Sequence, residues 1–106
     1  MSIDREELRF SILLILAASS GQKASGPSIS RALSRDRGLD ISRDALAIEY
    51  ALLDEVASAV VDQDVDGVHI LSLTEEGREH LLGMRLISKI RRPCPDELTR
   101  ARGLLQ

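Results

Sequence analysis

Cysteine and aromatic residues are almost missing from this chain of 106 residues. Its one cysteine, Cys94, cannot form an intramolecular disulfide or build a metal cluster alone, so we expect a reducing, cytoplasmic location. There is no tryptophan, and the aromatic residues are Phe10 and Tyr50. The core must therefore consist of Leu, Ile, Val and Ala, and this composition suits helices better than a β-sandwich.

Long hydrophobic runs are also missing. The apolar run ILLILAA covers residues 12–18 and is far shorter than the roughly 20 residues that cross a bilayer. The preceding DREELRF is acidic on balance, and no convincing small-residue cleavage site follows, so the run does not resemble a signal peptide. We expect a buried helix face at this position, with no membrane partner and no targeting segment.

Basic residues are absent from a central part of the chain. Residues 44–76 contain nine acidic residues and no Lys or Arg, whereas the rest of the chain has all 14 basic residues and 8 acidic ones. Affinity for nucleic acid depends largely on Lys and Arg side chains that contact phosphates. The charge is therefore asymmetric, and it makes this central part a poor surface for DNA.

Hydrophobic spacing predicts a mainly helical chain. Asp4 followed by Glu7 is a helix start signal, and Ile12 and Leu16 lie on one face of the helix that follows. Ser42 is a good N-cap for a longer helix. The predicted helices cover about 5–19, 27–38, 43–60, 74–91 and 96–104.

A change of period at residues 59–74 predicts two short strands, joined by a typical Asp-Gly hairpin turn at 66–67. Alternating aspartates here also resemble the start of a calcium-binding loop. Such a loop needs a glutamate at its twelfth position, where this chain has Leu73. We therefore interpret these aspartates as a solvated hairpin edge that resists aggregation. They are Asp62, Asp64 and Asp66.

The segment after the hairpin carries the most specific pattern in the chain. Leu73-Thr74 is followed by Gly77, three residues after the threonine, and by Leu81 on the next predicted helix. In this pattern and in the order of its elements, the chain resembles winged helix-turn-helix domains such as PadR-, MarR- and ArsR-like regulators. The third predicted helix is similar at Ser42, Leu46 and Leu53.

The resemblance implies a mainly α (α+β) winged-helix fold. Three helices would form the core, the hairpin would form the wing, and a fourth helix and a short C-terminal helix would follow. The winged-helix domain would cover residues 1–91, and residues 92–106 would form a tail or short helix. Small winged-helix proteins encoded by Mu-like phages have a similar size.

The same resemblance implies a small transcriptional regulator that binds double-stranded DNA as a homodimer, paired through its first and fourth helices and its C-terminal segment. Winged helices usually place the third helix in the major groove and the wing against the backbone or minor groove. Because both are acidic here, we expect phosphate contacts from basic residues around the second helix. These predicted DNA-binding residues are Lys23, Arg31, Arg35, Arg37 and Arg43.

The charge distribution supports a different function on the same fold, because a fold does not determine a function. In this alternative the protein is an interaction module whose acidic third helix and wing bind a basic protein partner and not DNA. The predicted partner-binding residues are Asp54, Glu55, Asp62, Asp64 and Asp66.

No sequence pattern indicates catalysis or a cofactor. Neither His69 nor His80 has a second metal ligand at a typical spacing. No base is signalled beside a nucleophile, and the loop at 19–27 lacks the Gly-Lys-Ser/Thr of a phosphate-binding loop. We therefore expect a protein that is not an enzyme and that uses no metal or cofactor.

Overall fold

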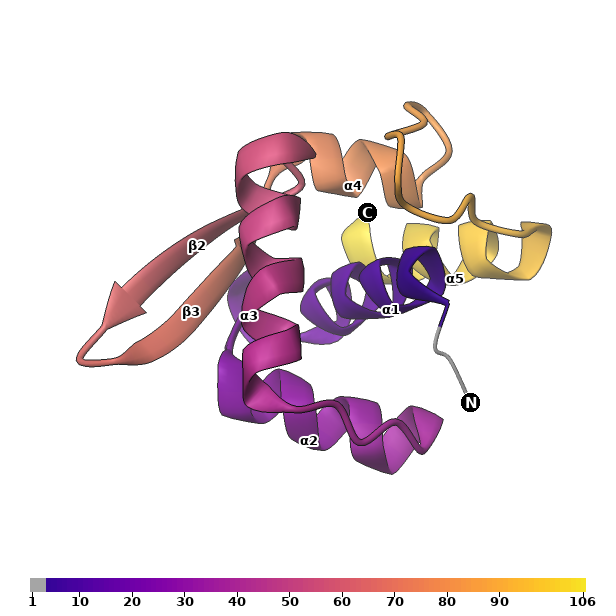
Figure 1. Cartoon of the computed structure of the whole chain (residues 1–106). Helices are drawn as coiled ribbons and strands as arrows, with labels where there is room; N and C mark the ends of the chain where they lie inside the picture. Colours follow the sequence, from indigo (N-terminus) through magenta and orange to yellow (C-terminus); the bar gives the residue numbers. More distant parts are fainter. Residues whose placement is uncertain (1–3) are drawn as a thin grey trace.

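A computed structural model describes residues 4–106 and has a mixed α+β fold that is mostly helical (Figure 1). Within these residues, five α-helices accompany a three-stranded antiparallel sheet. The helices are α1 (Arg5–Ala18), α2 (Gly26–Arg37), α3 (Arg43–Ala51), α4 (Glu75–Leu81) and α5 (Pro95–Leu105). The strands are β1 (Lys23–Ser25), β2 (Val60–Val65) and β3 (Val68–Leu73). A 3-10 turn covers Ser20–Gln22.

Helix α1 runs through the middle of the molecule and contacts α2, α4, α5 and the sheet (Figure 1). Asp4 caps its N-terminus by accepting from the backbone N–H groups of Glu6 and Glu7, at 3.0 and 3.3 Å. Four of its hydrophobic side chains have no exposed surface: Phe10, Ile12, Leu13 and Leu16. The predicted buried helix face is confirmed.

Helices α2 and α3 have the caps that the sequence predicts. Gly38 ends α2 in the left-handed conformation, with a φ of 65°. Ser42 caps α3 by accepting from the backbone N–H of Ala45 at 3.1 Å. Ser25 caps α2 in the same way, so this helix begins just before the predicted Pro27.

The third helix ends earlier than predicted. Its α-helical part stops at Ala51, and the chain winds into a wider π turn over Leu52–Val56. Ser58 then takes a φ of +54°, which no right-handed helix allows, and Val60 starts β2 instead of ending the helix. Leu46, Tyr50 and Leu53, which have helical spacing, are nevertheless buried.

The strands lie in the order β1-β3-β2, and both pairs are antiparallel. The predicted hairpin is confirmed. Its turn residues Asp66 and Gly67 both have positive φ, 54° and 81°, as a type I′ turn requires. The third strand, β1, is not predicted from the sequence, because Lys23–Ser25 is too short to show an alternating pattern.

The hairpin has two different faces, because successive side chains of a strand point to opposite sides of a sheet. Val60, Leu71 and Leu73 are buried on the inner face, which packs against the helices. The outer face exposes three apolar side chains. Val61 is 46% exposed, Val65 is 52% exposed and Val68 is 37% exposed.

The Leu-Thr-x-x-Gly pattern joins the hairpin to α4. Thr74 caps α4 by accepting from the N–H of Gly77 at 3.1 Å, and its hydroxyl donates to the carbonyl of Ser58 at 2.7 Å. A Cβ on Gly77 would lie 2.4 Å from the carbonyl oxygen of Ala59 and 2.7 Å from Cδ1 of Leu73. Glycine is therefore required at this position of the pattern, where α4 approaches the backbone.

The prediction that the fourth helix continues to residue 91 is wrong. Helix α4 ends at Leu81, and residues 82–94 form neither helix nor strand. Gly83 and Lys89 have positive φ, 74° and 73°, which interrupt a right-handed helix. Ile90 is buried all the same, so the apolar spacing of this segment reflects burial and not helix.

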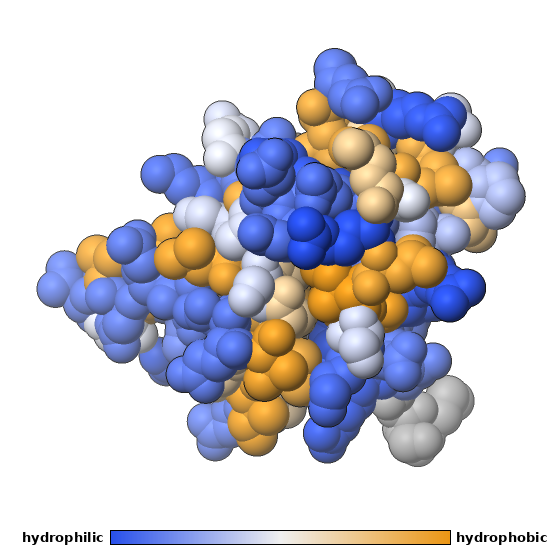
Figure 2. All heavy atoms as spheres, turned by 90° about the horizontal axis from the view of Figure 1, so that it is seen from above, coloured by the Kyte–Doolittle hydropathy of each residue, from blue (hydrophilic) through white to orange (hydrophobic). Residues whose placement is uncertain are grey.

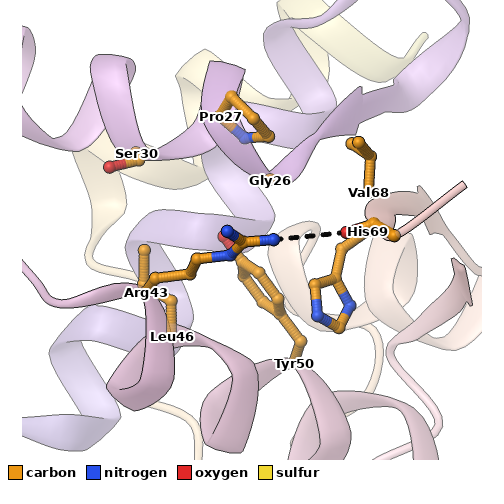
Figure 3. A pocket seen from close by; sticks show the side chains of 9 residues that line it. Gly26, Pro27, Ser30, Arg43, Leu46, Tyr50, Val68 and His69 are labelled. Atoms are coloured by element: carbon orange, nitrogen blue, oxygen red, sulfur yellow. Dashed lines mark hydrogen bonds between the residues drawn. The ribbon is translucent and has the colours of Figure 1, made fainter.

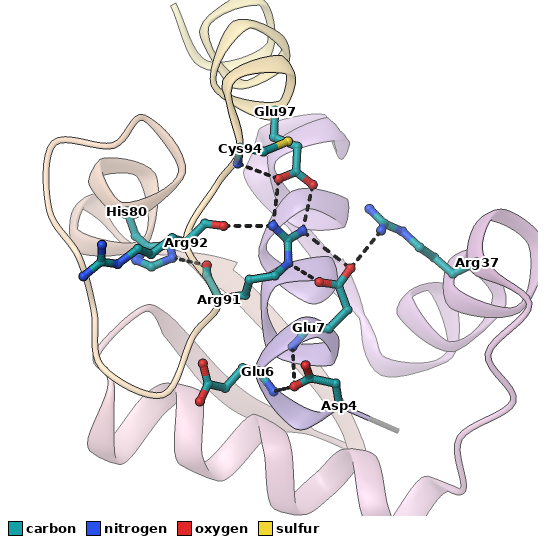
Figure 4. A network of polar contacts seen from close by, with 9 residues as sticks. All are labelled: Asp4, Glu6, Glu7, Arg37, His80, Arg91, Arg92, Cys94 and Glu97. Atoms are coloured by element: carbon teal, nitrogen blue, oxygen red, sulfur yellow. Dashed lines mark hydrogen bonds and ion pairs between the residues drawn. The ribbon is translucent and has the colours of Figure 1, made fainter. Parts of the chain in front are cut away.

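Arg91 fastens α5 to α1 (Figure 4). Its guanidinium donates to the carboxylate of Glu97 at 2.7 and 2.8 Å and also binds Glu7. The same group lies over the ring of Phe10, 4.1 Å from the ring centre. Its hydrogen bonds lower the pKa of Glu97 to about 2. The predicted C-terminal helix is thus present as α5, and it is packed on the helical core with Ala101 fully buried.

Candidate functional site

Three of the five predicted DNA-binding residues lie on the side formed by β1 and α2. Arg31 and Arg35 are exposed, one helical turn apart, and line a hollow between α2 and the end of α1. Lys23 is exposed on β1, and its neighbour Ala24 lines the same hollow. Arg35 donates to Asp36 at 2.8 and 3.3 Å, and this hydrogen bond lowers the pKa of Asp36. Part of the positive charge is therefore balanced locally.

The other two predicted DNA-binding residues point elsewhere. The Arg37 guanidinium lies 3.6 Å from Glu7 at the start of α1 (Figure 4). Arg43, the first residue of α3, donates to the carbonyl of Gly67 in the hairpin turn at 3.3 Å. The five residues that the sequence groups together are thus divided among three places.

Three of the five predicted partner-binding residues stabilise the hairpin. Asp62 contacts Nδ1 of His69 at 2.9 Å, and Asp54 accepts from the backbone N–H of Asp62 at 3.1 Å. Asp64 accepts from the N–H of Gly67 at 2.8 Å, inside the turn. These carboxylates have structural partners, which reduces their availability to another molecule. The remaining two predicted residues, which are exposed, are Glu55 and Asp66.

The outward side of α3 and its π turn is apolar. Ile48 and Val56 are each 62% exposed, and Leu52, half-buried, lies between them in the sequence. We call these three residues, spaced four apart, the α3 stripe. Exposed Asp44 and Glu55 accompany it. A helix that reads DNA bases presents Arg, Asn or Gln there instead. Figure 2 shows hydrophobic side chains along the lower middle of the view, where α3 lies.

A pocket lies between the N-terminal ends of α2 and α3 and the hairpin turn (Figure 3). Its volume is about 370 Å³, and three residues from each of these elements line it. Small-molecule sites commonly measure roughly 300–1,000 Å³. No sequence pattern signals the pocket, because its walls come from three separate segments of the chain.

Tyr50 is one of the residues that line this pocket, and its hydroxyl group is buried. The residue is 2% exposed, and its ring centre lies 5.4 Å from that of His69 in an edge-to-face arrangement. Its hydroxyl is buried without a hydrogen-bond partner among the described residues. Burial raises the pKa of Tyr50 to about 12, and the charge of Asp62 adds to the rise. Buried hydroxyl groups usually have a partner, so this one needs an explanation.

Residues 4–106 contain no group of three or more His, Cys, Asp or Glu side chains placed to hold a metal ion. The aspartates of the hairpin are thus not part of such a group in the described residues. Across the same residues, no helix has the length and apolar character needed to cross a membrane.

Comparisons with protein-family models, with curated proteins and with solved structures found no significant match to this chain.

Proposed function

We propose that this protein is a winged-helix interaction module that binds a basic partner protein through the α3 stripe. The succession of α1, β1, α2, α3, the β2–β3 hairpin and α4 supports the winged-helix assignment, with α3 as the third helix and the hairpin as the wing. The single observation that carries the function is the α3 stripe itself, which is apolar and has acidic neighbours.

The energetics of the stripe favour a protein surface. Burying an apolar side chain such as Ile48 or Val56 contributes about 1.5–3 kcal/mol, and both are now more than half exposed. The exposed carboxylates of Asp44 and Glu55 would repel DNA phosphates but attract Lys and Arg. Residues 44–76 contain no Lys or Arg to offset that charge. The expected partner therefore presents apolar side chains surrounded by basic ones.

Affinity capture from cells that express the protein tests this proposal. Wild-type protein should retain a basic protein, identified by mass spectrometry, and the double variant Ile48→Ser/Val56→Ser should lose it. Met84, which is 69% exposed on the segment after α4, provides the matched control, so Met84→Ser should retain the same protein. A capture that both variants retain equally would show that the α3 stripe is not the binding surface.

DNA binding is the second candidate function, and exposed Lys23, Arg31 and Arg35 on the β1–α2 side support it. Fluorescence anisotropy with a random duplex of about 30 base pairs, at roughly 50 and 200 mM salt, measures it directly. Several phosphate contacts would lower the affinity by orders of magnitude over that range. Arg31→Gln/Arg35→Gln should abolish such binding, whereas Arg102→Gln on α5 should not.

We also propose a homodimer, with an interface that differs from the one that the resemblance implies. Most of α1 is buried inside one chain, so this helix has little surface left for a second copy. The apolar side chains exposed on and near the C-terminal part of the chain are better candidates for such a contact. Leu86 and Leu104 are two of them. Light scattering after size-exclusion chromatography would give the mass of the particle in solution.

A further inference from the structure

The pocket beside the hairpin turn combines apolar walls with a cation. Pro27, Leu46, Val68 and the ring of Tyr50 supply apolar surface, and Arg43 supplies a guanidinium. Arg43 extends across the pocket toward the hairpin (Figure 3). Within the described residues, its hydrogen bond goes to a carbonyl and not to a carboxylate.

The hydrogen bond of Arg43 leaves much of its binding capacity unused. Its guanidinium has five N–H donors, and one of them reaches the Gly67 carbonyl at 3.3 Å, near the upper limit for such a bond. A carboxylate can accept two parallel N–H bonds from an arginine, which gives a stronger and more directional contact than one carbonyl. An incoming carboxylate would therefore compete well for this side chain.

Two further features favour an anion in the same place. Helices α2 and α3, of 12 and 9 residues, both begin at the pocket wall, and the N-terminal end of a helix carries partial positive charge. Independently, the buried hydroxyl of Tyr50 has no partner among residues 4–106. A hydroxyl can donate to a carboxylate oxygen, which would satisfy it.

We propose that this pocket binds a small organic acid with an apolar body, whose carboxylate is held by Arg43 and the Tyr50 hydroxyl. The volume of about 370 Å³ accommodates a ring or a branched chain of modest size. Occupation would draw Arg43 away from Gly67 and add contacts between α3 and the hairpin turn. The site would thus make the position of the wing sensitive to a metabolite, and it does not depend on which partner the α3 stripe binds.

Titration of the ¹⁵N-labelled full chain followed by NMR tests the proposal, with benzoate, cyclohexanecarboxylate and 4-methylpentanoate as probes. At least one probe should cause saturable shifts of the Gly26, Gly67 and His69 amide signals, with a millimolar dissociation constant. Benzamide has the shape of benzoate without the charge, and it should bind at least about tenfold more weakly than benzoate if benzoate binds. Absence of saturable shifts with all three acids would overturn the proposal.

Variants separate the site from general effects on the fold. Arg43→Gln should weaken binding at least about tenfold, whereas Arg102→Gln, an exposed change on α5, should leave it unchanged. Tyr50→Phe removes a buried hydroxyl that lacks a partner, so it should leave the Tm unchanged or higher while it weakens binding several-fold. Equal affinity of wild type and Arg43→Gln, or of benzoate and benzamide, would contradict carboxylate recognition here.

Discussion

The guanidinium of Arg9 on α1 and the carboxylate of Glu49 on α3 form a buried ion pair, with 2.6 Å between Nε and Oε2. Arg9 is 8% exposed and Glu49 is 3% exposed. Arg9 also donates to the carbonyl of Lys89 at 2.8 Å, so one side chain connects α1 to α3 and to the segment after α4. One of the nine acids of residues 44–76 is therefore neutralised inside the protein.

The Arg9–Glu49 pair should show strong coupling in a double-mutant cycle. Removal of one partner leaves a buried charge without compensation, so Glu49→Leu should lower the free energy of unfolding by about 3–5 kcal/mol. Arg9→Met/Glu49→Leu removes both charges and should recover most of that loss. Urea unfolding followed by circular dichroism of wild type, Glu49→Leu, Arg9→Met and the double variant gives the four values that the cycle requires. If the double variant is less stable than Glu49→Leu by a further several kcal/mol, the pair is not coupled as the structure indicates.

Substitution by alanine should have different effects on the stability of the protein at Gly77 and at Gly103. Gly77→Ala places a methyl group 2.4 Å from the Ala59 carbonyl oxygen and should cost about 2–3 kcal/mol of stability. Gly103 lies in α5, and an added Cβ would have no atom within 4 Å apart from its chain neighbours and the nearby backbone of its own helix. Alanine is the better helix former, so Gly103→Ala should be neutral or stabilising by up to about 1 kcal/mol. Thermal unfolding compares the two, and a neutral Gly77→Ala would contradict the close approach.

Tyr50 gives an optical signal of its own, because it is the one tyrosine and the chain has no tryptophan. Absorbance near 295 nm should report ionisation with a pKa of about 12 in the folded protein, against about 10 after unfolding. The unfolded chain loses this proton first, so the contribution of Tyr50 to stability is complete below pH 10 and falls as the pH rises toward 12. Asp62→Asn should lower the folded pKa, since the Asp62 charge contributes to the rise.

His80 should make the protein less stable in mild acid. It is fully buried, its Nδ1 accepts from the N–H of Ile87 at 2.9 Å, and its Nε2 lies 2.8 Å from the carbonyl of Arg91. This arrangement requires the neutral ring. Burial lowers the pKa of His80, and the positive charge of Arg91 lowers it further. The imidazolium is therefore disfavoured in the folded state.

The unfolded chain takes up this proton near pH 6.5, before the folded protein does. The neutral ring of His80 therefore makes its full contribution to the free energy of unfolding above about pH 6.5. This contribution is lost as the pH falls toward the lowered pKa, and the free energy of unfolding changes by at most about 1.4 kcal/mol per pH unit. Urea unfolding at several pH values between about 7.5 and 5.5 measures that slope. His80→Gln should remove the slope and His69→Gln should retain it; a slope that survives in His80→Gln would assign the effect to another group.

Local signals predict the elements of this fold well where a single side chain determines them. Ser42 caps α3, and Asp66 and Gly67 form the hairpin turn, both as the sequence predicts. The Leu-Thr-x-x-Gly pattern also leads into a helix, α4, as predicted. These are short-range interactions, so nearby residues contain the necessary information.

The extent of the fourth helix and the grouping of the basic residues could not be predicted in the same way. Ile87 and Ile90 have helical spacing, but they pack on the core from an irregular segment in which Gly83 and Lys89 have positive φ. A periodic pattern reports burial, and more than one backbone path can bury the same side chains. Likewise, Arg37 lies near Arg35 in the sequence, yet it pairs with α1 because α1 crosses there.

The π turn at Leu52–Val56 gives the chain an unusual tolerance for a change of length. A π turn holds one residue more than an α-helical turn of similar extent, and the backbone bond between Ala57 and Leu52 closes it. Loss of one residue here can be absorbed by conversion to an ordinary turn, with the hairpin kept in its register. A deletion within β2 would instead move every following side chain to the other face of the sheet. We therefore expect that the length of the chain can vary at the junction between α3 and the hairpin without rebuilding of the core.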